Sequence, residues 1–194
     1  MTHLAVQGNV ASSAQNQALN ALLFLYKEVL QKEVDWLNNV TRAKKPARLP
    51  VVLTVDEVRA LLLQLDGTSW LMASLLYGSG LRLMECVRLR VKDLELTRCE
   101  IIVRDGKGGR NRVTMLPTRL VSHLKDQLGH VKSLHERDLA EGYGLVYLPQ
   151  ALARKYPNAS QELGWQYVFP ASKRSVDPRS GTERRHHLHE TVLQ

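Results

Sequence analysis

The chain has 194 residues, of which 44% are hydrophobic and 24% are charged, and these values are normal for a globular protein. No apolar run approaches the roughly 20 residues that span a membrane. The N-terminus lacks the basic start and apolar block of a secretory signal, so we expect a cytoplasmic protein. The formal net charge of +8 and a pI of ≈ 9.7 favour polyanionic partners. Charge alone fits an ordinary basic enzyme equally well.

The first segment predicts a helix. Ser12 and Gln15 have capping-box spacing. Apolar residues then recur at helical spacing: Leu19, Leu22, Leu23, Tyr26, Val29, Leu30, Val34 and Leu37. Because one helix cannot bury such a face alone, we expect residues 1–41 to be the C-terminal part of a helical domain that begins outside this chain.

Residues 42–53 predict a linker between domains, because Pro46 and Pro50 oppose helix formation. Four cations lie in this short piece: Arg42, Lys44, Lys45 and Arg48. Such a cluster is either a solvated charge run or an extended segment that holds a DNA backbone, and we favour the second interpretation.

Residues 54–194 predict a second domain. Thr54 and Glu57 form another capping box, and we expect the helix that follows to end at Asp66 and Gly67. A second helix is expected from Trp70 to Tyr77, closed by Gly78, and a third after Gly80 that carries Leu83, Cys86 and Val87.

A change of pattern at residue 99 predicts a β-hairpin. Residues 99–104 and 113–116 are rich in β-branched side chains, and the glycine-rich sequence DGKGGRN separates them. Helical spacing returns at Thr118, whereas the sequence becomes irregular beyond Gly142, with an expected exposed loop at 177–183 and a helix start at His186. The fold class is therefore mainly α with a small antiparallel β-hairpin (α+β), without alternating βαβ units.

Two cations stand in chemically informative places. Arg82 follows a glycine turn at a helix start, and its planar guanidinium suits two oxygens of a phosphodiester. Lys107 lies at the glycine-flanked tip of the hairpin, where the backbone can approach DNA and the ammonium can give a proton to a leaving oxygen. Either residue alone is more often a plain surface cation.

Together, the two segments resemble the tyrosine recombinase family. These segments are residues 78–94, GSGLRLMECVRLRVKDL, and residues 103–117, VRDGKGGRNRVTMLP. In that family an arginine follows a Gly-x-Gly-Leu turn and a lysine lies in the next hairpin, which implies catalytic roles for Arg82 and Lys107. Asp93 agrees with the pattern, and Glu85 is expected to pair with Arg82 or Arg88 and to support the fold.

Within the family, the chain is most similar to integron integrases, on residues 17–30 and a long segment at about 142–190. The resemblance implies that this segment is an insertion that binds a folded single-stranded recombination site. Trp165, Tyr167 and Phe169 either stack on unpaired bases or form a local core. The expected DNA-binding cations of the hairpin and insertion are Arg110, Arg112, Lys173, Arg174, Arg179, Arg184 and Arg185.

Other ligands fit poorly. The glycines near Arg82 and Lys107 do not match a dinucleotide loop that opens a helix. His186, His187 and His189 have poor chelating spacing beside two arginines, so we expect no metal and no cofactor. Cys86 and Cys99 are too few for a disulfide scaffold and are expected to be buried thiols.

The resemblance also implies what a complete recombinase needs. A His-x-x-Arg pair, a later His or Trp and a nucleophilic tyrosine would follow the insertion, and none of the six tyrosines stands at a matching position. The chain is therefore expected to be a fragment that binds DNA but cannot cleave it alone, while the intact protein forms a 3′-phosphotyrosine and acts as a homo-oligomer on DNA. The alternatives are a non-catalytic DNA-binding module and a non-functional gene remnant.

Overall fold

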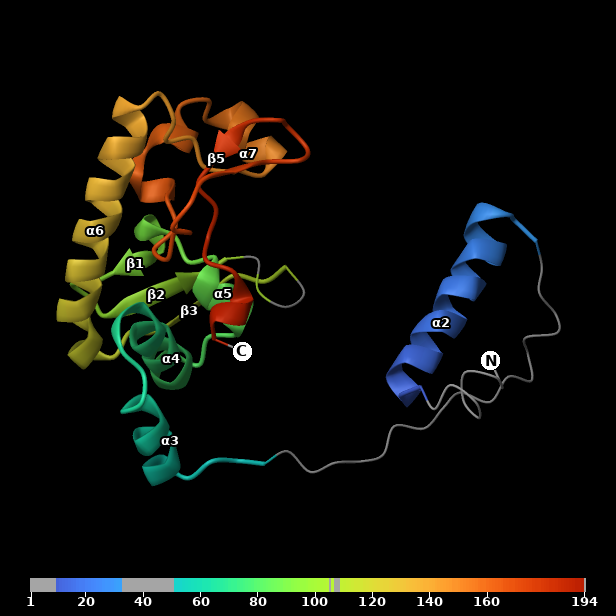
Figure 1. Cartoon of the computed structure of the whole chain (residues 1–194), viewed down its shortest axis with the longest axis horizontal. Helices are drawn as coiled ribbons and strands as arrows, with labels where there is room; N and C mark the ends of the chain where they lie inside the picture. The colour runs from blue at the N-terminus through green and yellow to red at the C-terminus, as the bar shows by residue number, and fades with distance from the viewer. Residues whose placement is uncertain (1–9, 33–50, 105, 107–108, 194) are drawn as a thin grey trace. The chain divides into compact units, whose positions relative to one another are not determined.

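The computed structural model describes residues 10–32, 51–104, 106 and 109–193. Contacts divide the chain into two compact units, Met1–Val52 and Leu53–Gln194, and each is described by itself. The described part is mainly helical with two small antiparallel sheets (Figure 1). None of its helices is both long and apolar enough to cross a membrane.

The first unit contains helix α2 (Ser12–Phe24), which continues into a π-helical turn (Leu25–Val29). The predicted capping box is wrong: Ala11 occupies the cap position without a side-chain bond, and Gln15 donates to the carbonyl of Val10 at 2.6 Å. The helix also ends earlier than its apolar pattern predicts, and Gln31 has a φ of 50°. The last two residues of that pattern, at 34 and 37, lie outside the described residues.

The second unit begins with α3 (Val55–Leu62) and α4 (Gly67–Ser79). The capping box at the start of α3 is confirmed, because Thr54 and Glu57 bond to each other reciprocally. The predicted boundaries of α4 are wrong. Asp66 precedes the helix as its cap residue, and the helix passes through Gly78 to end at Gly80, whose φ of 63° is the left-handed conformation that glycine adopts readily.

A three-stranded antiparallel sheet follows the short helix α5 (Leu83–Val87). Its strands are β1 (Leu94–Glu95), β2 (Glu100–Val103) and β3 (Arg112–Met115), in the order β1-β2-β3. The β2–β3 pair is the predicted hairpin, whereas β1, which a 3-10 turn (Val91–Asp93) introduces, was not predicted. Cys99, between β1 and β2, is only partly buried, so the expectation of a buried thiol is wrong there and confirmed for Cys86.

A 3-10 turn (Thr118–Leu120) leads into α6 (Val121–Ala140), which confirms the helix predicted from Thr118. The main core joins α4, α5, the sheet and the start of α6. Its largest fully buried side chain is Phe169, which is 0% exposed and comes from the irregular segment after α6.

The irregular segment after α6 is orange to red in Figure 1: its orange part lies beside the end of that helix, and its red C-terminal turn lies beside α5. It contains α7 (Gln150–Lys155), the strands β4 (Ser175–Val176) and β5 (Glu183–Arg184), and the 3-10 turns Ala159–Gln161, Leu163–Trp165 and Glu190–Val192. The expected loop at 177–183 closes the β4–β5 hairpin. The helix expected from His186 is wrong, because Leu188 donates to the carbonyl of Phe169 at 2.8 Å and the backbone there is extended.

Candidate nucleic-acid interface

Arg82 is positioned by the end of α4 and the start of α5. The left-handed Gly80 turns the chain, the buried Leu81 anchors it in the core, and Arg82 stands at the cap position of α5. Its backbone N–H donates to Glu85 Oε2 at 2.9 Å, and its Nη1 donates to Glu85 Oε1 at 2.8 Å. The side chain of Arg82 is nevertheless 57% exposed.

Glu85 is shared between two arginines. Arg112 on β3 donates from Nη1 to Oε1 at 2.8 Å and from Nη2 to Oε2 at 2.7 Å. The hydrogen bond from Arg112 is the largest cause that lowers the pKa of Glu85 to about 2, and the bonds from Arg82 add to it. The expected pairing of Glu85 with Arg82 is confirmed, and its second partner is Arg112 rather than Arg88.

The hairpin loop returns to this cluster at Gly106. A Cβ at this position would lie 2.9 Å from the carbonyl oxygen of Arg110 and 3.4 Å from Glu85 Oε1, so only glycine fits closely. Lys107 itself lies outside the described residues, and its role stays a prediction. Arg110 is exposed, while the linker cations Arg42, Lys44, Lys45 and Arg48 also lie outside the described residues.

A groove of about 640 Å³ lies between α5, β2 and the segment after α6. Its lining is rich in basic side chains: Arg88, Arg90, Arg104, Arg179, Arg184, His186 and His187. Three carboxylates also line it, at positions 85, 93 and 177, so the cations are in excess. The net positive charge of this lining suits a polyanionic ligand.

The groove cations divide into fixed and free groups. Arg104 is held by Asp93 at 2.6 Å, and Arg184 lies 3.8 Å from Asp177. Arg90 donates to backbone carbonyls, including that of residue 147 at 2.9 Å. Within the part of the chain that the structure describes, the guanidiniums of Arg88 and Arg179 have no ion pair and are exposed, which leaves them available to phosphate oxygens.

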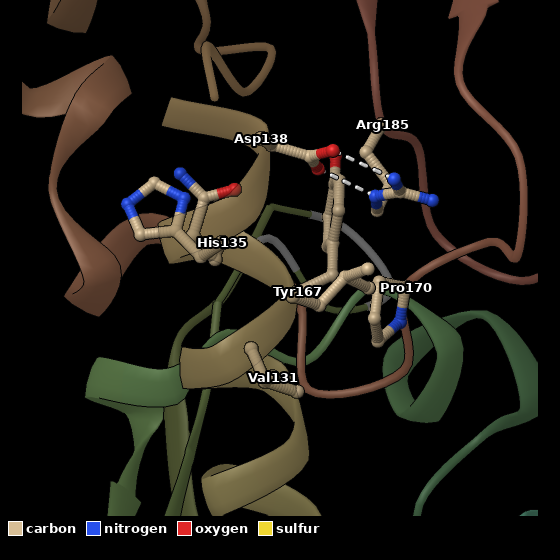
Figure 2. A pocket seen from close by; sticks show the side chains of 8 residues that line it. Val131, His135, Asp138, Tyr167, Pro170 and Arg185 are labelled. Carbon is tan, nitrogen blue, oxygen red and sulfur yellow. Dashed lines mark hydrogen bonds and ion pairs between the residues drawn. The ribbon is translucent and has the colours of Figure 1, made fainter. Parts of the chain in front are cut away.

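Two of the predicted DNA-binding arginines form ion pairs that hold the segment after α6 to that helix. Figure 2 shows Asp138 on α6 reaching Arg185, whose Nε and Nη2 donate at 2.6 and 2.7 Å. Arg174 donates to the same carboxylate at 3.0 Å and to Glu141 at 2.6 Å. Arg185 is only 13% exposed and Arg174 only 22%, whereas Lys173 beside them is exposed.

The aromatic side chains of the segment after α6 mainly build cores. Phe169 is fully buried in the main core, and Tyr167 is 5% exposed in a second cluster with Val146 and Leu148. The local-core interpretation is therefore the correct one for these two rings. Trp165 is partly exposed, and Lys92 Nζ lies 2.6 Å from its ring centroid. Lys92 has a pKa lowered to about 8, mainly by desolvation and then by Arg104.

The histidines at the groove edge form a ring pair. His186 and His187 have ring centroids 4.2 Å apart, and burial lowers the pKa of both. His189 accepts from the backbone N–H of Thr191 instead. In the described ranges, no three His, Cys, Asp or Glu side chains are grouped so that they could hold a metal ion.

The sequence pattern of the phage integrase family matches residues 51–190. The chain belongs to this tyrosine recombinase family. The pattern of the N-terminal SAM-like domain of phage integrases matches residues 1–36. The fold of this recombinase-family chain is thus an integrase catalytic-domain fold preceded by part of a SAM-like domain.

Relatives of this recombinase-family chain carry integrase and recombinase names. An integrase/recombinase of Escherichia coli and one of Pseudomonas aeruginosa are each 45% identical over 194 residues, which is 100% of this chain and 58% of the relative. The tyrosine recombinase XerA of Pyrococcus horikoshii is 36% identical over 115 residues, 58% of this chain and 39% of XerA. A crystal structure of XerA recombinase aligns with a TM-score of 0.38 and 29% identity, covering 66% of this chain and 45% of that chain. The chain spans less than two thirds of the length of these relatives.

For this integrase-family chain, sequence reasoning missed part of the groove. Arg88, Arg90 and Arg104 line it but were not among the expected DNA-binding residues. The basic run RLRVKD at 88–93 was a signal for the first two. Arg104 carried no signal of its own, because only the fold brings the end of β2 beside the segment after α6.

Proposed function

We propose that this chain is the DNA-binding part of an integron-integrase-like recombinase. Residues 1–41 would belong to the core-binding domain, 42–53 to a basic linker and 54–194 to the catalytic domain, with an insertion at about 142–190. The carrying observation is the groove, where the exposed Arg88 and Arg179 face a space bounded by both the α5 region and the insertion. A folded single strand offers phosphates to such cations and unpaired bases to the partly exposed Trp165.

Arg82 is proposed to bind the scissile phosphodiester. Its side chain is 57% exposed and its guanidinium uses one nitrogen for Glu85, so further N–H donors remain for non-bridging phosphate oxygens. Lys107 is proposed as the proton donor to the leaving oxygen. The glycine-flanked hairpin sequence around it supports this role.

Cleavage through a 3′-phosphotyrosine is proposed for the complete recombinase, acting without metal and as a homo-oligomer on DNA. We propose that this chain binds DNA without cleaving it. Tyr167 lines the groove but is buried, and desolvation raises its pKa, which opposes nucleophilic attack. Tyr143 lies under Arg174, 4.0 Å from its guanidinium carbon. Incubation with a nicked-site oligonucleotide, followed by denaturing electrophoresis, should show no covalent adduct.

Equilibrium binding tests the proposed recognition. The purified chain is titrated with a folded hairpin that carries unpaired bases and with a fully paired duplex of the same length, at several salt concentrations. Tighter binding to the hairpin is expected, with log K falling by about 0.7 to 0.9 per phosphate contact for each tenfold rise in salt. Equal, weak binding to both would contradict the proposal and favour a non-specific basic surface or a non-functional remnant.

A further inference from the structure

The carboxylate of Glu85 is held unequally by its two arginines. Arg82 gives it a single guanidinium bond, at 2.8 Å, and is 57% exposed. Arg112 gives it two parallel bonds, at 2.8 and 2.7 Å, one to each oxygen, and is 35% exposed. Glu85 itself is only 8% exposed. Arg82, the more exposed arginine, therefore binds Glu85 through one side-chain hydrogen bond, whereas the less exposed Arg112 binds it through two.

This inequality decides which arginine can move. Removing one partner of a buried charge is strongly unfavourable when no other countercharge remains. If Arg82 were the only partner of Glu85, its transfer to a phosphate would leave a carboxylate buried and unpaired. The bidentate pair with Arg112 is the stronger geometry, and it remains complete when Arg82 leaves.

The strand geometry keeps Arg112 in place. Arg112 begins β3, where it is paired in register with Val103 of β2. Two residues further along the same strand, the hydroxyl of Thr114 donates to the carbonyl of Ser79 at 2.8 Å, which ties β3 to the end of α4. Arg112 Nη2 also lies 3.5 Å from the carbonyl oxygen of Gly80, immediately before the turn that presents Arg82.

We propose that Arg112 is a positioning residue that neutralises Glu85 and thereby releases Arg82 to bind a DNA phosphate. This inference rests on the proposed function, in which Arg82 meets the phosphodiester. It replaces the expectation that Arg112 itself contacts DNA. The two roles differ in one measurable respect: a direct DNA contact adds affinity independently of Arg82, whereas a positioning role makes the contribution of Arg82 depend on Arg112.

A double-mutant cycle separates these roles. The contribution of Arg82 is the ratio of hairpin affinities before and after Arg82→Gln, measured with the full 194-residue chain in three backgrounds. We expect the loss to be on the order of tenfold in the wild-type background, typical of one charge-assisted contact. In the Arg112→Gln background the loss of affinity on Arg82→Gln should fall below about threefold, because Glu85 then retains Arg82. In the background that combines Glu85→Gln with Arg112→Gln, the loss of affinity on Arg82→Gln should return to about tenfold, because no buried carboxylate remains to retain Arg82.

Matched controls guard against a folding artefact. Arg98→Gln removes one cation from an exposed pair with Glu100 on the same sheet. It should leave the loss of hairpin affinity on Arg82→Gln unchanged. Circular dichroism and thermal melts monitor folding of each variant. If Arg112→Gln fails to fold, Arg112→Lys takes its place, since lysine keeps the positive charge but cannot form the bidentate pair. The loss of affinity on Arg82→Gln should still be smaller in this background than in the wild type.

The outcomes are distinguishable. An equal loss on Arg82→Gln in the wild-type and Arg112→Gln backgrounds overturns the positioning role and leaves the proposed function standing. If Arg82→Gln causes no loss of affinity in any background while the hairpin still binds, Arg82 does not contact a phosphate, and the positioning role of Arg112 is overturned as well. Absence of hairpin binding by the wild-type chain overturns the proposed function itself.

Discussion

Replacing Asp138 with asparagine tests whether ion pairs hold the segment after α6 to that helix. Asp138 is 4% exposed and accepts two bonds from Arg185, at 2.6 and 2.7 Å, and one from Arg174, at 3.0 Å. Breaking a buried ion pair from one side costs about 3–5 kcal/mol. Both arginines retain other acceptors, such as Glu141, which Arg174 reaches at 2.6 Å. We therefore expect a loss of unfolding free energy at the lower end of this range, about 3 kcal/mol.

Urea denaturation followed by circular dichroism measures this change. The matched control is Asp126→Asn on the exposed face of the same helix, which should stay within about 0.5 kcal/mol of the wild type. A loss below about 1 kcal/mol for Asp138→Asn would refute the reasoning, because it would mean that the network contributes no more than a surface pair.

The pH dependence has a definite sign. Hydrogen bonds from Arg185, and then from Arg174, hold the pKa of Asp138 below its ordinary value of 3.8. A depressed pKa in the folded state gives stability that is present above the unfolded pKa and is lost as the pH falls through the folded one. The difference in the free energy of unfolding between the wild type and Asp138→Asn should therefore be largest at pH 7 and should narrow as the pH falls below 3.8.

Three further predictions follow from the core and the helix ends. Phe169→Ala should lower the free energy of unfolding by about 3–5 kcal/mol in urea titrations, because a fully buried ring leaves a cavity; a loss under about 1 kcal/mol would show that the ring is not in the core. Thr54→Ala should cost about 1 kcal/mol in the same assay through loss of the α3 cap, and an unchanged midpoint would contradict the capping geometry. A thiol reagent at pH 8 should modify Cys99 well before Cys86, because burial raises the pKa of Cys86 to about 12; mass spectrometry that finds Cys86 modified first would contradict this order.

Local signals explain which elements the sequence could predict. The capping box at Thr54 and the β-branched hairpin strands with their glycine-rich turn depend on neighbours within a few residues, and both are confirmed. The two-residue strand β1 and the end of α4 depend on distant contacts. Gly78 lies inside α4 and packs against Pro117, where an added Cβ would come within 2.6 Å of the proline Cγ, and this contact has no signature in the local pattern.

The candidate site was predictable only in part for the same reason. Arg82 could be found because a short motif surrounds it. By contrast, Arg174 and Arg185 read as free cations in the sequence, and only tertiary structure brings Asp138 to them from about 36 and 47 residues away. Phe169 likewise lies in a basic, irregular segment, yet it is buried in a core built mainly by residues between positions 71 and 124.

The salt dependence of DNA binding tests most directly whether the groove is the DNA-contacting surface. The hairpin affinity is measured across salt concentrations for the wild type, for Arg88→Gln with Arg179→Gln in the groove, and for Arg98→Gln with Arg137→Gln outside it. Both double variants remove two exposed cations, and the control pair does not line the groove. We predict that the groove pair lowers the slope of log K against log salt by about 1.4 to 1.8, while the control pair leaves it unchanged. An equal change from both pairs would show that net charge alone drives binding and would contradict a specific groove.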